Sequence, residues 1–193
     1  MELLKERIRK EGKILPGNIV KVDGFLNHRI DVPLMEQIAQ EFRRVFAGKD
    51  ITLVLTAEAS GIALALAAAH FLDDIPVVFA KKRPAANQSA DMLTAVAHSF
   101  THGNDNALRV DRRYLPAGSR VLVVDDFLAD GEASRALISI VEQAGCTLVG
   151  VGIAVEKGFQ PGGRKLREAG VNLKSLAIVT SIQDGRIQLA DDD

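Results

Sequence analysis

Apolar residues recur along the chain in two spacings that alternate from one end to the other. Short, nearly continuous apolar runs are typical of strands buried on both faces, as in a parallel sheet. Apolar residues three or four positions apart predict helices with one buried face. The runs predict strands at 51–56, 76–80, 93–100, 121–124, 147–155 and 171–181. The wider spacing predicts helices at 3–11, 32–47, 62–71, 134–144 and 164–169.

This alternation predicts an α/β protein with a mostly parallel, twisted sheet flanked by helices. Asp184-Gly185 is typical of a hairpin turn and predicts a last short strand at 186–189. The segment 14–30 mixes apolar and polar residues without a period, so we expect it to be irregular. With 193 residues, we expect one domain that buries about 70% of its unfolded surface.

The stretch 121–134 joins a buried strand, two acids and a short turn into a helix. Asp125 and Asp126 follow the strand, where we expect exposed carboxylates, and the turn is Ala129–Ala133. Ligands of open α/β sheets bind at the carboxyl ends of strands, and the start of a helix presents free N–H groups to an anion. Carboxylates accept hydrogen bonds from sugar hydroxyls. The stretch therefore favours a ribose 5-phosphate site over an ordinary turn with two solvated acids.

Two further strand ends carry groups suited to anions. The small residues of 57–61 lie between a strand and a helix, which predicts a second anion site. Lys81-Lys82-Arg83 ends the strand at 76–80. These cations either form a solvated rim or, beside two phosphate sites, screen a pyrophosphate. The polar stretch 84–91, the strand at 93–100 and the turn at 102–106 predict a lid over the site.

Composition excludes several functional classes. The net charge of -1 gives no basic excess for binding nucleic acid. The single Cys146 is typical of a reducing compartment, and the charged first residues do not resemble a signal peptide. The longest apolar run, 62–69, is far shorter than the ~20 residues of a membrane span. We therefore expect a cytoplasmic protein that binds neither nucleic acid nor membrane. The histidines His70, His98 and His102 show no metal-ligand spacing.

The motif of four apolar residues, an acidic pair and a small-residue loop resembles the phosphoribosyl-diphosphate signature of type I phosphoribosyltransferases. Lys-Val-Asp-Gly-Phe-Leu-Asn-His-Arg-Ile-Asp, at 21–31, resembles the base-recognition segment of the bacterial xanthine phosphoribosyltransferases. Glu-Lys-Gly-Phe-Gln-Pro-Gly, at 156–162, is similar to their second base-binding segment. The resemblance runs from the first helix to the last hairpin. The chain departs from the family at Asp130, where Thr or Ser is usual, and at Val20, where relatives carry Leu.

The resemblance implies a role for each of these segments. It implies catalytic roles for Asp125, Asp126 and Lys81, and xanthine contacts from Val20, Asn27 and Lys157. It implies that the pyrophosphate binds to Glu58, Ala59, Ser60 and Gly61. The 5-phosphate would bind to Ala129, Asp130, Gly131, Glu132 and Ala133. Without the resemblance, Asn27 and His28 are also explained by a capped loop that enters the helix after Asp31.

The resemblance further implies a type I fold over residues 1–193, with a small hood made by the N-terminal segment and the C-terminal hairpin. It implies a homodimer, and Mg²⁺ that arrives bound to the diphosphate with few or no direct protein ligands. The implied reaction transfers 5-phosphoribosyl from phosphoribosyl diphosphate to xanthine, which gives xanthosine 5′-monophosphate and pyrophosphate. The alternatives are an enzyme for hypoxanthine and guanine or for adenine, and a non-catalytic regulator that binds DNA or RNA. The near-neutral charge argues against the regulator.

Overall fold

A six-stranded sheet forms the centre of the computed structural model, which describes residues 1–17, 19–84, 91–98, 105–183 and 185–190. The strand order is β10-β9-β8-β7-β3-β4, and only β10 runs antiparallel to its neighbour. The strands are β3 (Leu53–Ala57), β4 (Val77–Ala80), β7 (Arg120–Leu128), β8 (Thr147–Lys157), β9 (Leu173–Gln183) and β10 (Arg186–Leu189).

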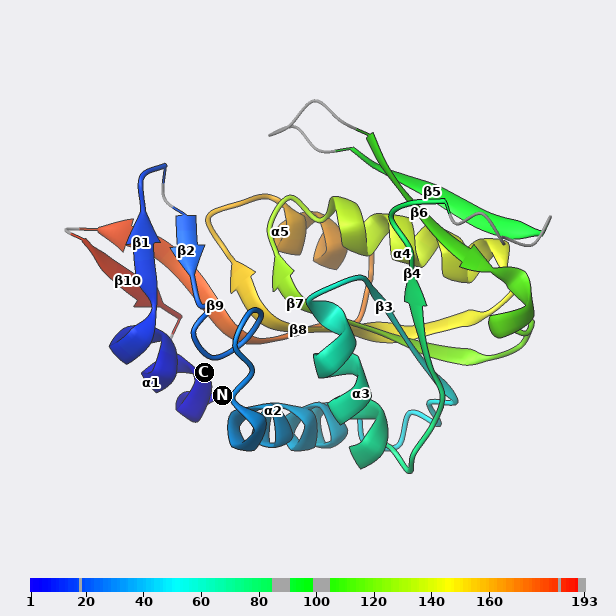
Figure 1. Cartoon of the computed structure of the whole chain (residues 1–193), viewed down its shortest axis with the longest axis horizontal. Coiled ribbons are helices and arrows are strands. Elements are labelled where there is room, and N and C mark those ends of the chain that lie inside the picture. Colours follow the sequence, from blue (N-terminus) through cyan, green and yellow to red (C-terminus); the bar gives the residue numbers. More distant parts are fainter. Residues whose placement is uncertain (18, 85–90, 99–104, 184, 191–193) are drawn as a thin grey trace.

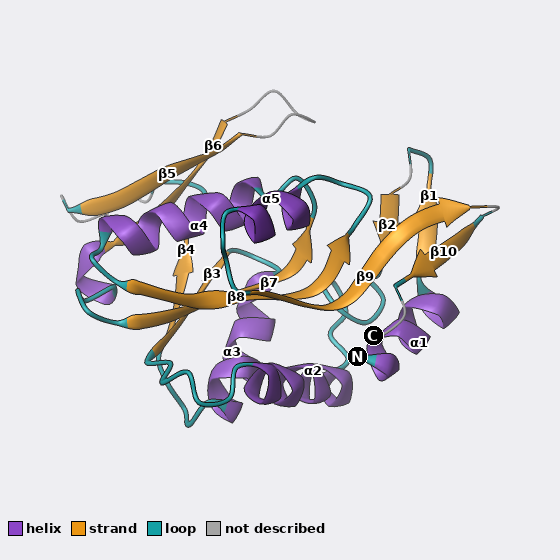
Figure 2. Ribbon diagram, turned by 180° about the vertical axis from the view of Figure 1, so that it is seen from behind, coloured by secondary structure: helices purple, strands orange, loops and turns teal. Residues whose placement is uncertain are grey.

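Helices cover both faces of this sheet (Figures 1 and 2). α2 (Val32–Val45) and α3 (Gly61–Phe71) lie on one face, and α4 (Glu132–Gln143) and α5 (Gly162–Glu168) lie on the other. Side chains alternate between the faces along β7, so Leu122 and Val124 join the core beneath α2 and α3. Val121 and Val123 join the core beneath α4. The predicted α/β fold is confirmed.

A hood closes one end of the sheet (Figure 1). It consists of α1 (Glu2–Glu11), the paired strands β1 (Lys13–Leu15) and β2 (Ile19–Lys21), and the β9–β10 hairpin. The N-terminal ammonium donates to the Leu176 carbonyl at 2.6 Å, which fixes α1 against β9. The hood is therefore confirmed, but the expectation of an irregular segment at 14–30 was wrong for its first part. Gly17, with a φ of +83°, allows the tight connection between β1 and β2.

A second hairpin packs over α4. Its arms are β5 (Met92–His98) and β6 (Asp105–Asp111), followed by the short 3₁₀ helix η1 (Arg112–Tyr114). The backbones of Lys81 and Arg109 exchange two hydrogen bonds of 2.9 Å, which attach β6 to the end of β4. The first arm matches the predicted strand, whereas the second was not predicted. Residues 85–90 and 99–104 of the expected lid lie outside the described residues.

The order of the strands places a crevice between β3 and β7. The chain leaves β3 for α3 on one face and leaves β7 for α4 on the other, so the connection direction reverses between these neighbours. Their pairing runs only to Leu55 and Val123, which lets the carboxyl ends of the two strands diverge. Ligands of open α/β sheets bind at such a switch point. Within the described ranges, the helices are too short or too polar to cross a membrane.

Candidate active site

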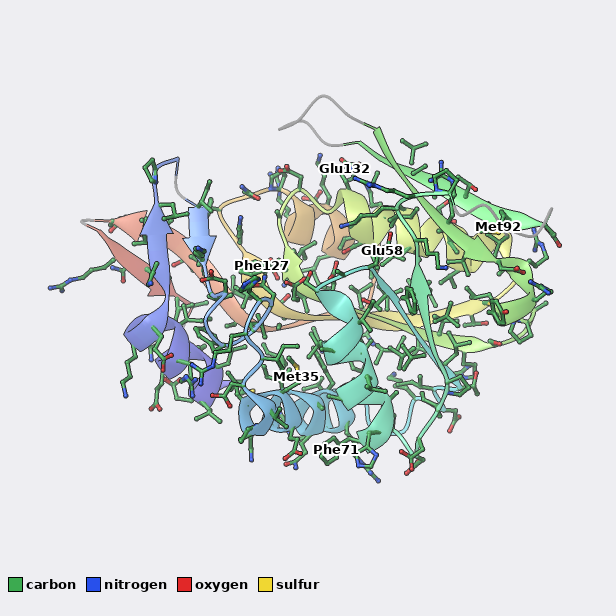
Figure 3. The ribbon with its side chains drawn as sticks, viewed as in Figure 1. Met35, Glu58, Phe71, Met92, Phe127 and Glu132 are labelled. Atoms are coloured by element: carbon green, nitrogen blue, oxygen red, sulfur yellow. The ribbon has the colours of Figure 1, made fainter. Side chains whose placement is uncertain are left out.

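A cleft of about 320 Å³ opens at this switch point. Figure 3 shows Glu58, Phe127 and Glu132 around it, at the edge of the sheet where β3 and β7 end. The loop after β3, the end of β7 with its loop, and both arms of the β5–β6 hairpin contribute to the walls. The lining residues are Ala57, Glu58, Ser60, Lys82, Ala97, Leu108, Asp125, Asp126, Phe127, Leu128, Ala129, Asp130, Gly131, Glu132, Ala133 and Ser134.

The acidic pair forms the floor of the cleft and is buried rather than exposed. Asp125 is 8% exposed and Asp126 is 6% exposed. The expectation of exposed acids after the strand was wrong, because β7 continues through both of them to Leu128 and pairs with β8 as far as Glu156. Segments from elsewhere in the chain then cover the two carboxylates. Removing either acid therefore changes a shielded environment and not a solvated strand end.

Both oxygens of the Asp126 carboxylate have partners. Asn27 Nδ2 donates to Oδ2 at 2.7 Å, and Ser60 Oγ donates to Oδ1 at 2.9 Å. The face alternation of β7 directs Asp126 to the side of α2 and α3, where Asn27 precedes α2 and Ser60 precedes α3. Two of the predicted subsites thus meet at one carboxylate.

Asp125 occupies a different electrostatic environment. Burial raises its pKa well above the usual range, and the adjacent Asp126 carboxylate raises it further. Its Oδ1 accepts from the Asp126 backbone N–H at 3.0 Å, which opposes the shift, as does the charge of Lys82. The surroundings of Asp125 in the protein therefore disfavour its ionised form.

The loop between β7 and α4 is shaped to bind an anion. Within the described chain, none of the N–H groups of residues 130–134 donates a hydrogen bond. Gly131 has a φ of +82°, a conformation that favours glycine, and a Cβ there would lie 3.1 Å from the Cα of Gly162. The Gly162 N–H donates to the Ala129 carbonyl at 3.1 Å and supports the loop from the start of α5. Free amides at the start of α4 are suited to a phosphate.

Glu132 repels an anion in this loop only weakly, because its negative charge is compensated within the helix. The Glu132 carboxylate forms an ion pair with Arg135 in the first turn of α4. The guanidinium compensates that charge, and the backbone amides remain available. The other loop acid, Asp130, is partly buried and lines the cleft.

The loop after β3 lies on the opposite wall of the cleft. Glu58 and Ser60 line it, whereas Ala59 and Gly61 are not among the lining residues. Glu58 Oε1 accepts from the backbone N–H of Lys82 at 2.6 Å, so this loop is joined to the end of β4. Lys82 is among the residues that line the cleft, and Lys81 is not.

The three predicted base-binding residues occupy different positions. Asn27 reaches the cleft through Asp126. Lys157 ends β8, and its Nζ lies 5.6 Å from the centre of the Phe127 ring, which lines the cleft. Val20 is 4% exposed and packs in the core of the hood side. The geometry thus brings Asn27 and Lys157 to the cleft and leaves Val20 behind its wall.

Sequence reasoning missed five contributors to the cleft: Ala97, Leu108, Phe127, Leu128 and Ser134. Leu108 and Val110 are buried and two positions apart, a strand period that was the available signal for β6. Phe127 follows the acidic pair directly, and its contact with Lys157 depends on the pairing of β7 with β8.

Comparison with known proteins agrees with this geometry. The model of the phosphoribosyl transferase domain matches residues 23–184. The chain belongs to this phosphoribosyltransferase family. The match includes both loops of the cleft, the acidic pair and residues 23–31 of the base-recognition segment. The family resemblance seen in the sequence is confirmed.

Several curated relatives of this phosphoribosyltransferase match it along almost their whole length. "Xanthine phosphoribosyltransferase 1" of Clostridium perfringens is 48% identical over 187 residues, which cover 97% of this chain and 98% of the relative. "Xanthine phosphoribosyltransferase" of Ruminiclostridium cellulolyticum is 48% identical over 191 residues, 99% of this chain and 100% of the relative. The protein of the same name in Laribacter hongkongensis is 49% identical over 187 residues, with 97% and 98% covered.

Solved structures confirm the fold. Adenine phosphoribosyltransferase from Rhodothermus marinus superposes with a TM-score of 0.75 at 22% identity, over 93% of this chain and 100% of that one. The enzyme from Trypanosoma brucei, in complex with AMP, pyrophosphate and ribose-5-phosphate, gives a TM-score of 0.74 at 22% identity, over 95% and 83%. Likeness at this level of identity concerns the fold alone.

Proposed function

We propose that this phosphoribosyltransferase transfers the 5-phosphoribosyl group of phosphoribosyl diphosphate to xanthine, and forms xanthosine 5′-monophosphate and pyrophosphate. The observation that carries the proposal is the cleft between β3 and β7. It combines amides at the start of α4 that have no partner among the described residues with a buried acidic pair and with Asn27. The names of relatives about 48% identical over nearly the full length support xanthine as the base.

In this proposal, each wall of the cleft holds a different part of the sugar diphosphate. The amides of 130–134 bind the 5-phosphate, because an anion at the start of a helix meets free N–H groups and the positive end of the dipole. The loop at 58–61 binds the pyrophosphate, with a cation from the end of β4. Asp125 and Asp126 lie beneath the ribose, between these two anion sites.

The acidic pair stabilises the charge that develops during transfer. The base nitrogen displaces pyrophosphate at the anomeric carbon, so positive charge grows on the sugar ring while negative charge grows on the leaving group. Preorganised opposite charges in a shielded site stabilise such a transition state. The raised pKa of Asp125 reflects a region in which negative charge is poorly solvated, and a cationic ring relieves it. No side chain has to form a covalent intermediate.

Magnesium fits this site as a companion of the substrate. Carboxylate oxygens such as those of Asp125 and Asp126 are ligands that Mg²⁺ accepts, but both Asp126 oxygens already have protein donors. When it is bound to the diphosphate, Mg²⁺ neutralises charge on the leaving group. We propose that it enters with phosphoribosyl diphosphate and takes few or no ligands from the chain.

Base selection rests on Lys157 and Asn27. Lys157 has only donors, so it pairs with the carbonyl at position six of xanthine and rejects the amino group of adenine. An unpaired donor in a shielded site costs ~1–3 kcal/mol and more when it is charged, as the Lys157 ammonium is, so we expect about tenfold or more against adenine. One hydrogen of the Asn27 amide points to Asp126, and the other is available for the carbonyl at position two of xanthine. The expected order is xanthine, then guanine and hypoxanthine, then adenine.

We further propose that residues 1–193 act as one catalytic domain of a cytoplasmic homodimer, without nucleic-acid or membrane partners. The near-neutral charge and the single cysteine support this setting.

The proposal is tested by assaying each purine separately with phosphoribosyl diphosphate and Mg²⁺, and by repeating the assay with Asn27→Ala. We expect nucleotide formation to require phosphoribosyl diphosphate and the substitution to narrow the gap between xanthine and hypoxanthine. An unchanged ratio of catalytic efficiencies would mean that Asn27 only holds the loop before α2. No turnover with any base would favour a non-catalytic regulator.

A further inference from the structure

Asp126 joins parts of the cleft that the proposed function assigns to different portions of the substrates. Asn27 belongs to the base-recognition segment, and Ser60 belongs to the pyrophosphate loop, yet both donate to this one carboxylate. The three residues come from before α2, from before α3 and from β7, so they meet only in the folded chain. Because Asp126 is only 6% exposed, water competes little for these hydrogen bonds.

The carboxylate fixes which end of the Asn27 amide faces it. A carboxylate accepts hydrogen bonds and does not donate them, whereas an amide has an NH₂ end that donates and an oxygen that accepts. The NH₂ group faces Asp126 Oδ2 at 2.7 Å. Rotating the amide by 180° would set oxygen against oxygen and lose a hydrogen bond to a charged group. Such a loss disfavours the rotated amide by about tenfold or more.

We propose that Asp126 determines the choice between xanthine and guanine by fixing the orientation of the Asn27 amide. The inference rests on the proposed function and extends it to a second role for the acid. Xanthine presents a carbonyl at position two, which accepts from the remaining amide hydrogen. Guanine presents an amino group there, which needs the amide oxygen instead. The fixed amide therefore matches xanthine. When guanine is bound, the NH₂ group of Asn27 and the amino group of the base face each other as two donors, with no acceptor between them.

Ser60 also binds the Asp126 carboxylate, but it does not determine the orientation of the Asn27 amide. Its hydroxyl donates to Asp126 Oδ1 at 2.9 Å, and a hydroxyl is able to donate or to accept. Ser60 therefore remains paired whichever polar end position 126 presents. The orientation of Asn27 depends on the chemistry of residue 126 itself.

Asp126→Asn is the decisive variant because it keeps the shape and removes the restriction. An amide at position 126 pairs with either end of Asn27, and Ser60 pairs with whichever end remains. Both orientations of Asn27 are then satisfied, so we expect the xanthine-to-guanine ratio of catalytic efficiencies to fall by about tenfold. Loss of a charge beneath the ribose lowers turnover with both bases alike and cancels in this ratio.

Asp125→Asn is the matched control. It removes the neighbouring acid from the same strand, keeps an oxygen for the Asp126 N–H and leaves the bond between Asn27 and Asp126 in place. We expect lower turnover with both bases and an unchanged ratio. Ser60→Ala, which keeps the carboxylate opposite Asn27, should also retain the ratio.

The measurement is the ratio of kcat/KM for xanthine and guanine in the wild type and the three variants. Where turnover is too low, the ratio of dissociation constants for xanthosine and guanosine 5′-monophosphates, measured by calorimetry, gives the same comparison. A ratio that falls with Asp126→Asn alone supports the inference. An unchanged ratio in that variant, or an equal fall with Asp125→Asn, overturns it while the transferase function stands. Wild-type enzyme that does not use xanthine overturns the proposed function itself.

Discussion

Replacing Asp125 with asparagine should make the free enzyme more resistant to heat and less active. The side chain is buried, and its pKa is raised well above the usual range, first by burial and then by the charge of Asp126. The ionised form is therefore disfavoured in the folded protein relative to the unfolded chain. Asparagine has nearly the same shape and no charge. It also keeps an oxygen for the Asp126 N–H, which now donates at 3.0 Å.

The size of the effect follows from linkage between protonation and folding. Each unit by which folding raises a pKa corresponds to about 1.4 kcal/mol against the ionised folded state. For a domain of this size, 1 kcal/mol shifts the melting temperature by about 2–4 °C. The variant should therefore melt about 3–5 °C higher for each 1.4 kcal/mol of this penalty that the substitution removes. Solvent screens this carboxylate only weakly, because it is only 8% exposed, so the gain in stability is not much reduced by screening.

The gain should depend on pH in a defined direction. The pKa of an aspartate in the unfolded chain is about 3.9, and that of the folded Asp125 carboxyl is higher. Below the unfolded pKa, Asp125 is protonated in both states and contributes no penalty. As the pH rises through the folded pKa, the penalty reaches its full size and then stays constant. The difference in melting temperature between variant and wild type should thus grow as the pH rises above the unfolded pKa and disappear below it.

Calorimetric or circular-dichroism melts at several pH values, together with steady-state turnover, test this prediction. We expect turnover to fall by ~10²-fold or more, since a preorganised charge beneath the reacting sugar is lost. Asp73→Asn is the control: this side chain is 87% exposed, and its positive φ is tolerated by asparagine. A lower melting temperature for Asp125→Asn at neutral pH, or unaltered turnover, would refute the reasoning.

Two further predictions follow from the cleft and the core. Lys82→Met should reduce transfer more than Lys81→Met, because Lys82 lines the cleft and Lys81 does not. Steady-state kinetics with varied phosphoribosyl diphosphate measures both effects, and a larger loss with Lys81→Met would contradict the prediction. Gly152→Ala should destabilise the fold by about 1–3 kcal/mol, since its Cβ would lie 2.9 Å from the Phe42 ring. Gly24→Ala, which meets no atom within 4 Å, should be near neutral in the same denaturant titration, and equal effects would contradict the packing argument.

Helix α2 illustrates what the sequence alone could predict. Leu34, Ile38 and Phe42 are buried on one face, and the Asp31 side chain accepts from the Leu34 N–H at 3.1 Å, as a helix-capping residue does. These are local signals, so they can be recognised without knowing the rest of the fold. The predicted end of the helix, at residue 47 before Gly48, was wrong: the helix stops at Val45.

The strands that were missed are short or depend on a partner. Lys13–Leu15 and Ile19–Lys21 are three residues each and carry too little period to be recognised, although Pro16-Gly17 is a typical turn signal between them. Asp105–Asp111 is a strand because it pairs with Met92–His98. Its polar first residues resemble a turn when the pairing is unknown.

The acidic pair shows why the chemistry of the site was only partly predictable. The motif and its order along the chain identified Asp125 and Asp126 as candidates. Their burial could not be inferred, because it comes from distant segments: Asn27 lies 99 positions from Asp126, and Ser60 lies 66 positions away. For the same reason, the fixed orientation of the Asn27 amide became visible only in the folded structure.

A competition assay tests the central claim most directly. Equal concentrations of xanthine, guanine, hypoxanthine and adenine are mixed with the enzyme, phosphoribosyl diphosphate and Mg²⁺, and the nucleotides formed are separated by chromatography. We predict that xanthosine 5′-monophosphate accumulates first, with one pyrophosphate released for each nucleotide, and that the adenine product forms last. Faster formation of any other nucleotide, or the absence of all four, would contradict the account.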